Sequence, residues 1–121
     1  MKCDEGYRCD VCGGDVTSIV ESDLYLRYVI GTLDPEVLHT TAERHLRCNP
    51  VLAQFIVDDR FPVIHAEGPM AKENLDADFV IQHSELVTRG YRRLHEIASW
   101  SGDRDITEYP LPDVIGHYRD A

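Results

Sequence analysis

The chain has 121 residues, of which 43% are hydrophobic and 28% charged, a composition typical of a globular domain and not of a disordered chain. Twenty-two acidic residues outnumber twelve basic ones, and the net charge of −10 argues against a protein that binds the phosphate backbone of nucleic acid. No apolar run reaches the roughly 20 residues of a membrane helix, and the N-terminus lacks the apolar stretch of a signal peptide, so we expect a cytoplasmic protein that does not enter a membrane.

Residues 1–21 are expected to form a short β-hairpin. Its tight turn lies in "CDVCGG", where Gly13 and Gly14 allow backbone angles that other residues avoid. The β-branched residues that follow in "DVTSIVES" favour a second strand. The turn of this hairpin carries Cys9 and Cys12.

Helix signals follow at residues 22–31, 34–48 and from residue 49 onward. Each region begins with a capping residue, and the last two place a proline at the first helical position. Residues 58–77 contain two prolines and a glycine with little periodicity, so we expect a long loop with a short extended piece at "PVIH". The longest helix is expected over residues 78–101, where Gly90 indicates close packing against another element.

Together these elements predict a single α+β domain that is mostly helical. A zinc-knuckle hairpin (1–21) packs on a body of about four helices (22–101), and residues 102–121 form an extended tail. The arginines of the long helix, Arg89 and Arg92, are expected to pair with carboxylates on the same helix, Glu85 and Glu96, four residues away in each case. Such pairing would leave no basic surface for nucleic acid.

Cys9 and Cys12 have the spacing of a metal-binding knuckle, in which two thiolates two residues apart bind one tetrahedral ion. The second half of a site is found in "ERHLRCNP", where His45 and Cys48 are three residues apart and share a face of the expected helix. The four residues form a Cys3His set, which is typical of closed structural zinc sites. Iron is the alternative metal, although imidazole combined with thiolate favours zinc.

Two other residues compete as ligands. His39 lies nearly two turns before His45 on the same expected helix, and Cys3 lies near the N-terminus. If one ligand were absent, water could bind the metal, and His39 and Glu43 would be the nearest groups for proton transfer. We interpret these two residues instead as part of a solvated helix face, and no catalytic residue is predicted.

Residues 23–50, "DLYLRYVIGTLDPEVLHTTAERHLRCNP", resemble the zinc-binding anti-sigma factor domain. That family shows a short helix, an L-x-P-E helix start and a helix ending in H-L-x-x-C-x-x-C, and this chain has "YLRYVIG", "LDPE" and "ERHLRC" in the same order. The resemblance implies His45 and Cys48 as ligands and a sigma factor as partner. Two features depart from it. Cys48 follows His45 by three positions instead of four, and Val51 occupies the place of the second cysteine, so the upstream knuckle would supply the missing thiolates.

The sequence therefore favours a small zinc-binding protein with a structural metal, acting as a protein-binding or regulatory module. Two alternatives remain open. One is a thiol redox sensor that releases zinc on oxidation, and the other is a small zinc enzyme with an open metal position. A protein partner is expected, and the tail could also reach a second copy of the chain.

Overall fold

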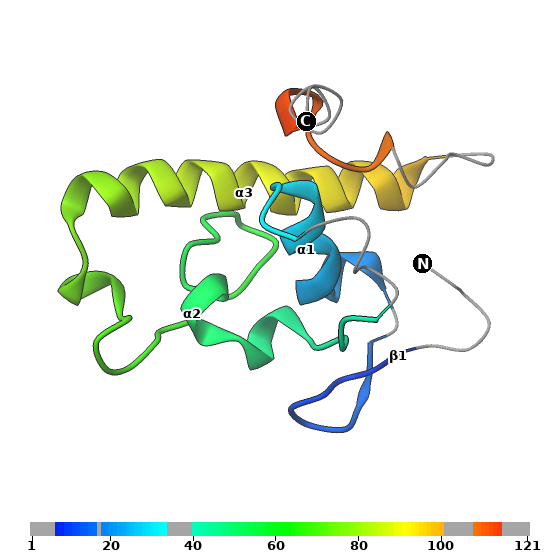
Figure 1. Ribbon diagram of the computed structural model, residues 1–121, viewed down its shortest axis with the longest axis horizontal. Helices are drawn as coiled ribbons and strands as arrows, with labels where there is room; N and C mark the ends of the chain where they lie inside the picture. The colour runs from blue at the N-terminus through cyan, green and yellow to red at the C-terminus, as the bar shows by residue number, and fades with distance from the viewer. Residues whose placement is uncertain (1–6, 17, 34–39, 101–107, 115–121) are drawn as a thin grey trace.

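The computed structural model describes residues 7–16, 18–33, 40–100 and 108–114. As predicted, the fold is α+β and mostly helical, with a short hairpin near the N-terminus (Figure 1). The hairpin consists of β1 (Tyr7–Arg8) and β2 (Asp15–Val16), which pair antiparallel with Tyr7 opposite Val16. After β2, the chain forms a 3-10 turn, η1 (Ile19–Glu21), where the sequence had suggested a longer strand.

The first predicted helix is present as α1 (Asp23–Val29). Ser22 caps it, because its hydroxyl oxygen accepts a hydrogen bond from the Tyr25 N–H at 3.0 Å. The helix predicted from residue 49 is also present, but it is short: α2 (Pro50–Ala53) ends after one turn. Both helices thus begin where their capping signals indicate.

The helix predicted over residues 34–48 is wrong in its described part. Residues 40–45 are not helical, and only a 3-10 turn, η3 (Leu46–Cys48), follows them; residues 34–39 lie outside the described residues. The carbonyl groups of Glu43 and Arg44 accept hydrogen bonds from the N–H groups of Asp10 and Asp23, at 2.8 and 3.0 Å. Backbone groups that pair with distant segments in this way cannot also close the turns of a helix.

A long loop separates α2 from the last large helix, as predicted. Residues 57–71 contain no helix or strand, and a 3-10 turn, η4 (Lys72–Asn74), follows them. The longest helix, α3 (Ala77–Ser99), spans most of the molecule in Figure 1 and is capped by Asp76, whose carboxylate accepts the Phe79 N–H at 3.1 Å. The extended tail predicted over residues 102–121 is wrong at residues 112–114, which are helical; residues 101–107 and 115–121 lie outside the described residues.

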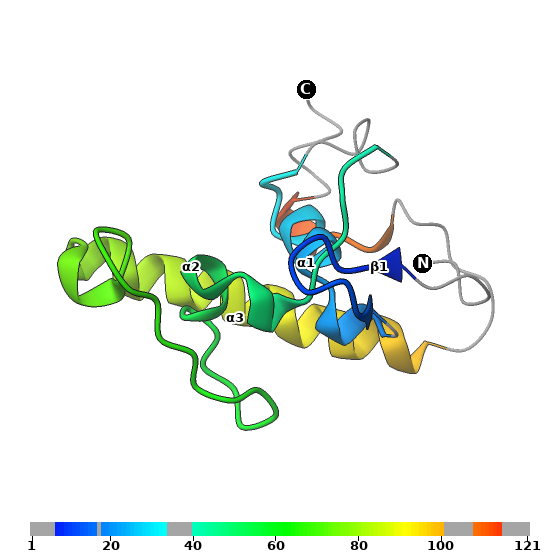
Figure 2. The ribbon, with the colours of Figure 1, turned by 90° about the horizontal axis from the view of Figure 1, so that it is seen from below.

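The hydrophobic core lies where α1 and η1 pack on α3. Figures 1 and 2 both place α1 against the middle of α3, with α2 and the long loop beside its N-terminal half. Leu26 and Val29 of α1 and Val87 and Leu94 of α3 are fully buried in this core. In the part of the chain that the structure describes, no helix has the length and hydropathy needed to cross a membrane.

The arginines of α3 form ion pairs, but Arg89 and Arg92 do so with partners outside the helix. Arg89 contacts Asp113 at 3.0 Å, and Arg92 contacts Asp58 at 3.2 Å. The prediction that these two arginines pair with carboxylates of their own helix is therefore wrong. The long loop supplies Asp58 and the C-terminal segment supplies Asp113 instead. These pairs connect both segments to α3.

Gly90 lies where α1 packs on α3, which confirms the close packing expected from the sequence. A Cβ at this position would clash with Ile30 Cγ2 and would lie 2.9 Å from Leu26 Cδ1. We expect Gly90→Ala to lower the free energy of unfolding by about 1–2 kcal/mol, because overpacking outweighs the ~1 kcal/mol gain in helix propensity. Urea unfolding measures this, with the exposed Gln82→Ala as a control that should change little. A Gly90→Ala protein more stable than the parent would contradict the tight contact.

Candidate metal centre

The structure brings together all four residues that the sequence predicted as ligands. Cys9 and Cys12 lie on the turn between β1 and β2, His45 lies just before η3, and Cys48 ends η3. Their three sulfur atoms and one imidazole nitrogen all lie within 4.8 Å of one another, a grouping that could hold a metal ion. The cysteines among the described residues are free thiols.

The hairpin turn holds Cys9 and Cys12 on the same side. The Cys9 N–H donates to the Gly14 carbonyl at 2.8 Å, and the Gly13 N–H donates back to the Cys9 carbonyl at 2.9 Å. Gly13 has φ of +76°, a left-handed conformation that other residues rarely adopt. This turn thus explains why a glycine follows the second cysteine.

Cys9 is the best-shielded of the three thiols. Its side chain is almost fully buried, and its sulfur accepts three backbone N–H groups: Val11 at 3.4 Å, Cys12 at 3.5 Å and His45 at 3.3 Å. Burial raises the pKa of this thiol, but the backbone hydrogen bonds outweigh it and lower the pKa to about 6. Amide groups directed at a sulfur in this way are typical of metal-binding knuckles, because they stabilise the thiolate.

His45 presents one specific nitrogen to the sulfur atoms. Its Nε2 lies 2.8 Å from the Asp15 carbonyl oxygen, which can only accept, so Nε2 carries the proton. In the neutral imidazole, the form that binds a metal, the lone pair is then on Nδ1, which lies 3.3 Å from Cys12 Sγ and 3.9 Å from Cys48 Sγ. A metal-binding histidine commonly has its other nitrogen fixed by a carbonyl or carboxylate, and the Asp15 carbonyl fixes Nε2 of His45 in the same way.

The sequence predicted that His45 lies on an α-helix, but the structure places it outside any helix. Its backbone is extended, with φ of −70° and ψ of 145°, and it forms an antiparallel bridge with Ser22. The spacing of three residues still brings the side chains of His45 and Cys48 together, because the 3-10 turn that begins after His45 returns the chain toward His45 within three residues. The structure thus brings the two predicted ligands together, although the predicted local structure was wrong.

Cys48 shows why the cluster favours a cation. Burial, and then the neighbouring thiols of Cys9 and Cys12, raise the pKa of Cys48 to about 11. Three sulfur atoms this close to one another cannot all be anionic unless a positive ion neutralises them.

The donor set and its spacing fit a tetrahedral metal ion such as zinc or iron. Donor atoms that bind zinc at about 2.0–2.3 Å in a tetrahedron lie roughly 3.3–3.8 Å from one another. The distances from Nδ1 of His45 to Cys12 Sγ and Cys48 Sγ, 3.3 and 3.9 Å, are close to this range. Soft thiolates with one imidazole suit zinc or iron and do not suit magnesium or calcium. The rival ligands Cys3 and His39 lie outside the described residues.

Glu43, the candidate for proton transfer in the enzyme alternative, is engaged in structural hydrogen bonds. It is buried, with Ser22 Oγ at 2.8 Å from both carboxylate oxygens, and it accepts the N–H groups of Leu24 at 3.3 Å and Arg44 at 3.0 Å. Burial raises the pKa of Glu43 above its ordinary value. The predicted solvated helix face is therefore wrong for Glu43, which helps to cap α1 from a distant segment.

The chain was also compared with protein-family models, with curated proteins and with solved structures, and nothing matches. The chemistry of the site must therefore be argued from the geometry of this chain alone.

Proposed function

We propose that Cys9, Cys12, His45 and Cys48 hold one zinc ion in a closed structural site. The observation that carries the proposal is the orientation of His45, whose Nδ1 lone pair is directed at the thiols while Nε2 is fixed by Asp15. Four protein donors complete the tetrahedral coordination of the ion and leave no coordination position for a substrate or water. This favours a structural metal over an enzyme.

The ion would join the N-terminal hairpin to the segment that precedes α2. That segment is tied to α1 by the Ser22–His45 bridge and by the Glu43 carboxylate. A metal at this junction would therefore order the N-terminal end of α1 as well as the hairpin. We infer that the zinc maintains a helical surface on which a protein partner binds, and that the chain acts as a binding or regulatory module.

The partner proposal has two supports. The net charge of −10 disfavours nucleic acid, and the resemblance of residues 23–50 to the zinc-binding anti-sigma factor domain suggests a sigma factor as the class of partner. Pull-down from the native host, with the metal-loaded and the chelated chain as paired baits, tests both ideas. Recovery of a sigma factor by the metal-loaded chain alone would support the resemblance. Equal capture of a partner by both baits would show that partner binding does not depend on the metal.

The metal proposal predicts one zinc per chain in protein purified under reducing conditions, measured by plasma mass spectrometry. Cobalt substitution should give the visible spectrum of a tetrahedral, thiolate-rich site. A protein that binds no zinc or cobalt would refute the site. Iron in place of zinc would keep the ligand set but change the metal.

One observation favours a redox sensor as a second candidate. Cys12 is exposed to solvent, while Cys9 beside it is buried and hydrogen-bonded, so an oxidant can reach one member of a close thiol pair. Hydrogen peroxide would oxidise two thiolates to a disulfide and would itself be reduced to two waters on uptake of two protons, with release of the zinc. Zinc release within minutes of mild peroxide treatment, reversed by a thiol reductant, would support this role; a site that keeps its zinc would exclude it.

A further inference from the structure

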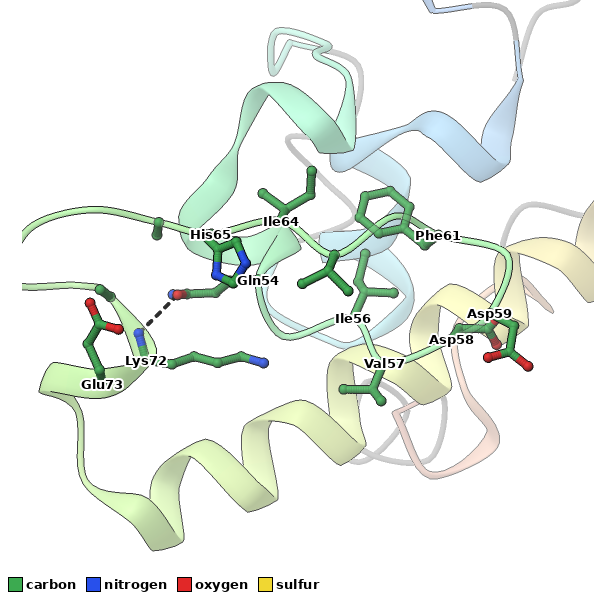
Figure 3. A pocket seen from close by; sticks show the side chains of 13 residues that line it. Gln54, Ile56, Val57, Asp58, Asp59, Phe61, Ile64, His65, Lys72 and Glu73 are labelled. Atoms are coloured by element: carbon green, nitrogen blue, oxygen red, sulfur yellow. Dashed lines mark hydrogen bonds between the residues drawn. The ribbon is translucent and has the colours of Figure 1, made fainter.

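A hollow with a volume of about 350 Å³ lies between the end of α2, the long loop and η4 (Figure 3). It does not include any of the four metal ligands. A hollow of this size is within the range that holds small organic molecules. Its lining residues come from positions 54–73 and include Gln54, Ile56, Val57, Val63 and Lys72.

The wall of the hollow is held in place by a buried glutamine. Gln54 is 5% exposed, and its Nε2 donates to the carbonyls of Val51 at 3.0 Å and Met70 at 2.8 Å. Its Oε1 accepts the Lys72 N–H at 3.0 Å, which Figure 3 shows as a dashed line. The returning end of the long loop is thus fixed to α2, so the hollow is preformed and does not depend on ordering by a ligand.

One part of the hollow's surface is apolar. Ile56, Ala66 and Ala71 are buried in it, whereas Val57 and Val63 are 61% and 79% exposed. These two exposed side chains provide apolar surface at the hollow, and a ligand with an apolar part would remove that surface from water.

Lys72 supplies the polar contact. Its side chain extends along the hollow in Figure 3, and its ammonium lies 5.8 Å from the centre of the Phe55 ring. Among the described residues it forms an ion pair with no carboxylate, although the chain carries a net charge of −10. The Asp58 carboxylate at the hollow is already paired with Arg60 at 2.9 Å and Arg92 at 3.2 Å. An unpaired ammonium beside apolar surface suits an anion with an apolar body.

Two exposed carboxylates limit the charge of that anion. Asp59 and Glu73 line opposite ends of the hollow in Figure 3. They would repel a dianion such as a phosphate ester more strongly than a singly charged group. Among anions with an apolar part, a monocarboxylate therefore suits this lining better than a phosphate ester.

We propose that this hollow binds a small aliphatic monocarboxylate, with its carboxylate on Lys72 and its hydrocarbon chain against Ile56, Val57 and Val63. The site is separate from the metal proposal and could be correct if that proposal failed.

The test uses hexanoate as the probe and the lysine side chains as reporters. The sequence contains two lysines, Lys2 and Lys72, so a protein labelled with ¹³C-lysine gives two ε-methylene signals, with Lys2 as an internal control. Hexanoate should shift the Lys72 signal with a Kd on the order of 1 mM, and neutral hexanamide should bind at least about fivefold more weakly. Inorganic phosphate should leave the Lys72 signal in place.

Two variants complete the test, with methyl signals of the loop valines and isoleucines as the readout. Lys72→Met keeps the apolar stem and should weaken hexanoate binding at least about fivefold. Val63→Asp, at an exposed position in the hollow, should weaken it as well, whereas Ile81→Asp, at an exposed position on α3 outside the lining, should not. Equal shifts of Lys2 and Lys72, equal affinity for hexanamide, or unchanged binding by Lys72→Met would each overturn the proposal.

Discussion

Replacing Cys48 with alanine is expected to abolish tight zinc binding and to cause a large loss of stability. The change leaves two thiolates and one imidazole, and it opens the site at the turn that joins the hairpin to α2. Because structural zinc binding is coupled to folding, we expect the zinc content to fall from about one per chain to near zero in the presence of a competing chelator. The free energy of unfolding should fall by about 4 kcal/mol or more.

Cys3→Ala is the matched control for this experiment, because it removes a cysteine that lies outside the proposed ligand set. It should keep one zinc per chain and the parent melting temperature. A chelator should lower the melting temperature of the parent and of Cys3→Ala, and it should have little further effect on Cys48→Ala. Full zinc content and an unchanged melting temperature in Cys48→Ala would show that the ligand set is wrong, and zinc loss in Cys3→Ala would identify the missing ligand.

The clustering of Cys9, Cys12, His45 and Cys48 could be predicted from the sequence because its two halves each have a local signature. Cys9 and Cys12 are close enough that one turn must bring them together, and the same holds for His45 and Cys48. The route between the halves could not be predicted. The segment before His45 has capping and periodicity that favour a helix, but its carbonyl groups pair with the hairpin and with α1. Tertiary hydrogen bonds of this kind leave no trace in local sequence and override helix propensity.

For α3, too, the features set by neighbouring residues could be predicted from the sequence, and the contacts with distant segments could not. Its bounds and the tight packing at Gly90 follow from periodicity and from one glycine among helix formers. The partners of Arg89 and Arg92 do not, since Asp113 and Asp58 lie more than twenty residues away in the sequence. The hollow beside α2 could not be predicted from the sequence either. Gln54 is an ordinary polar residue in the sequence, and only the structure shows that its side-chain amide binds the long loop.

Asp23→Ala is expected to cost about 3 kcal/mol of stability without removing the metal. Asp23 is fully buried, and its Oδ2 lies 2.8 Å from Arg44 Nε and 3.0 Å from Arg27 Nε. Its Oδ1 accepts a hydrogen bond from Asn49 Nδ2 at 2.8 Å, so one carboxylate connects α1, the segment before His45 and the start of α2. Removal of one partner from a buried charge network costs about 3–5 kcal/mol. The lower value applies here because the arginine side chains are 24% and 33% exposed and can regain water.

Asp113→Ala is the matched control, since Asp113 also pairs with an arginine but both side chains are more than half exposed. Its loss should change the free energy of unfolding by less than about 1 kcal/mol. Urea unfolding of the two variants, with zinc content measured in parallel, separates a buried network from a surface pair. If Asp23→Ala costs no more than Asp113→Ala, the carboxylate does not connect the three segments. If it also loses its zinc, the network positions the metal ligands as well as the helices, because Arg44 and Asn49 each adjoin a ligand in the sequence.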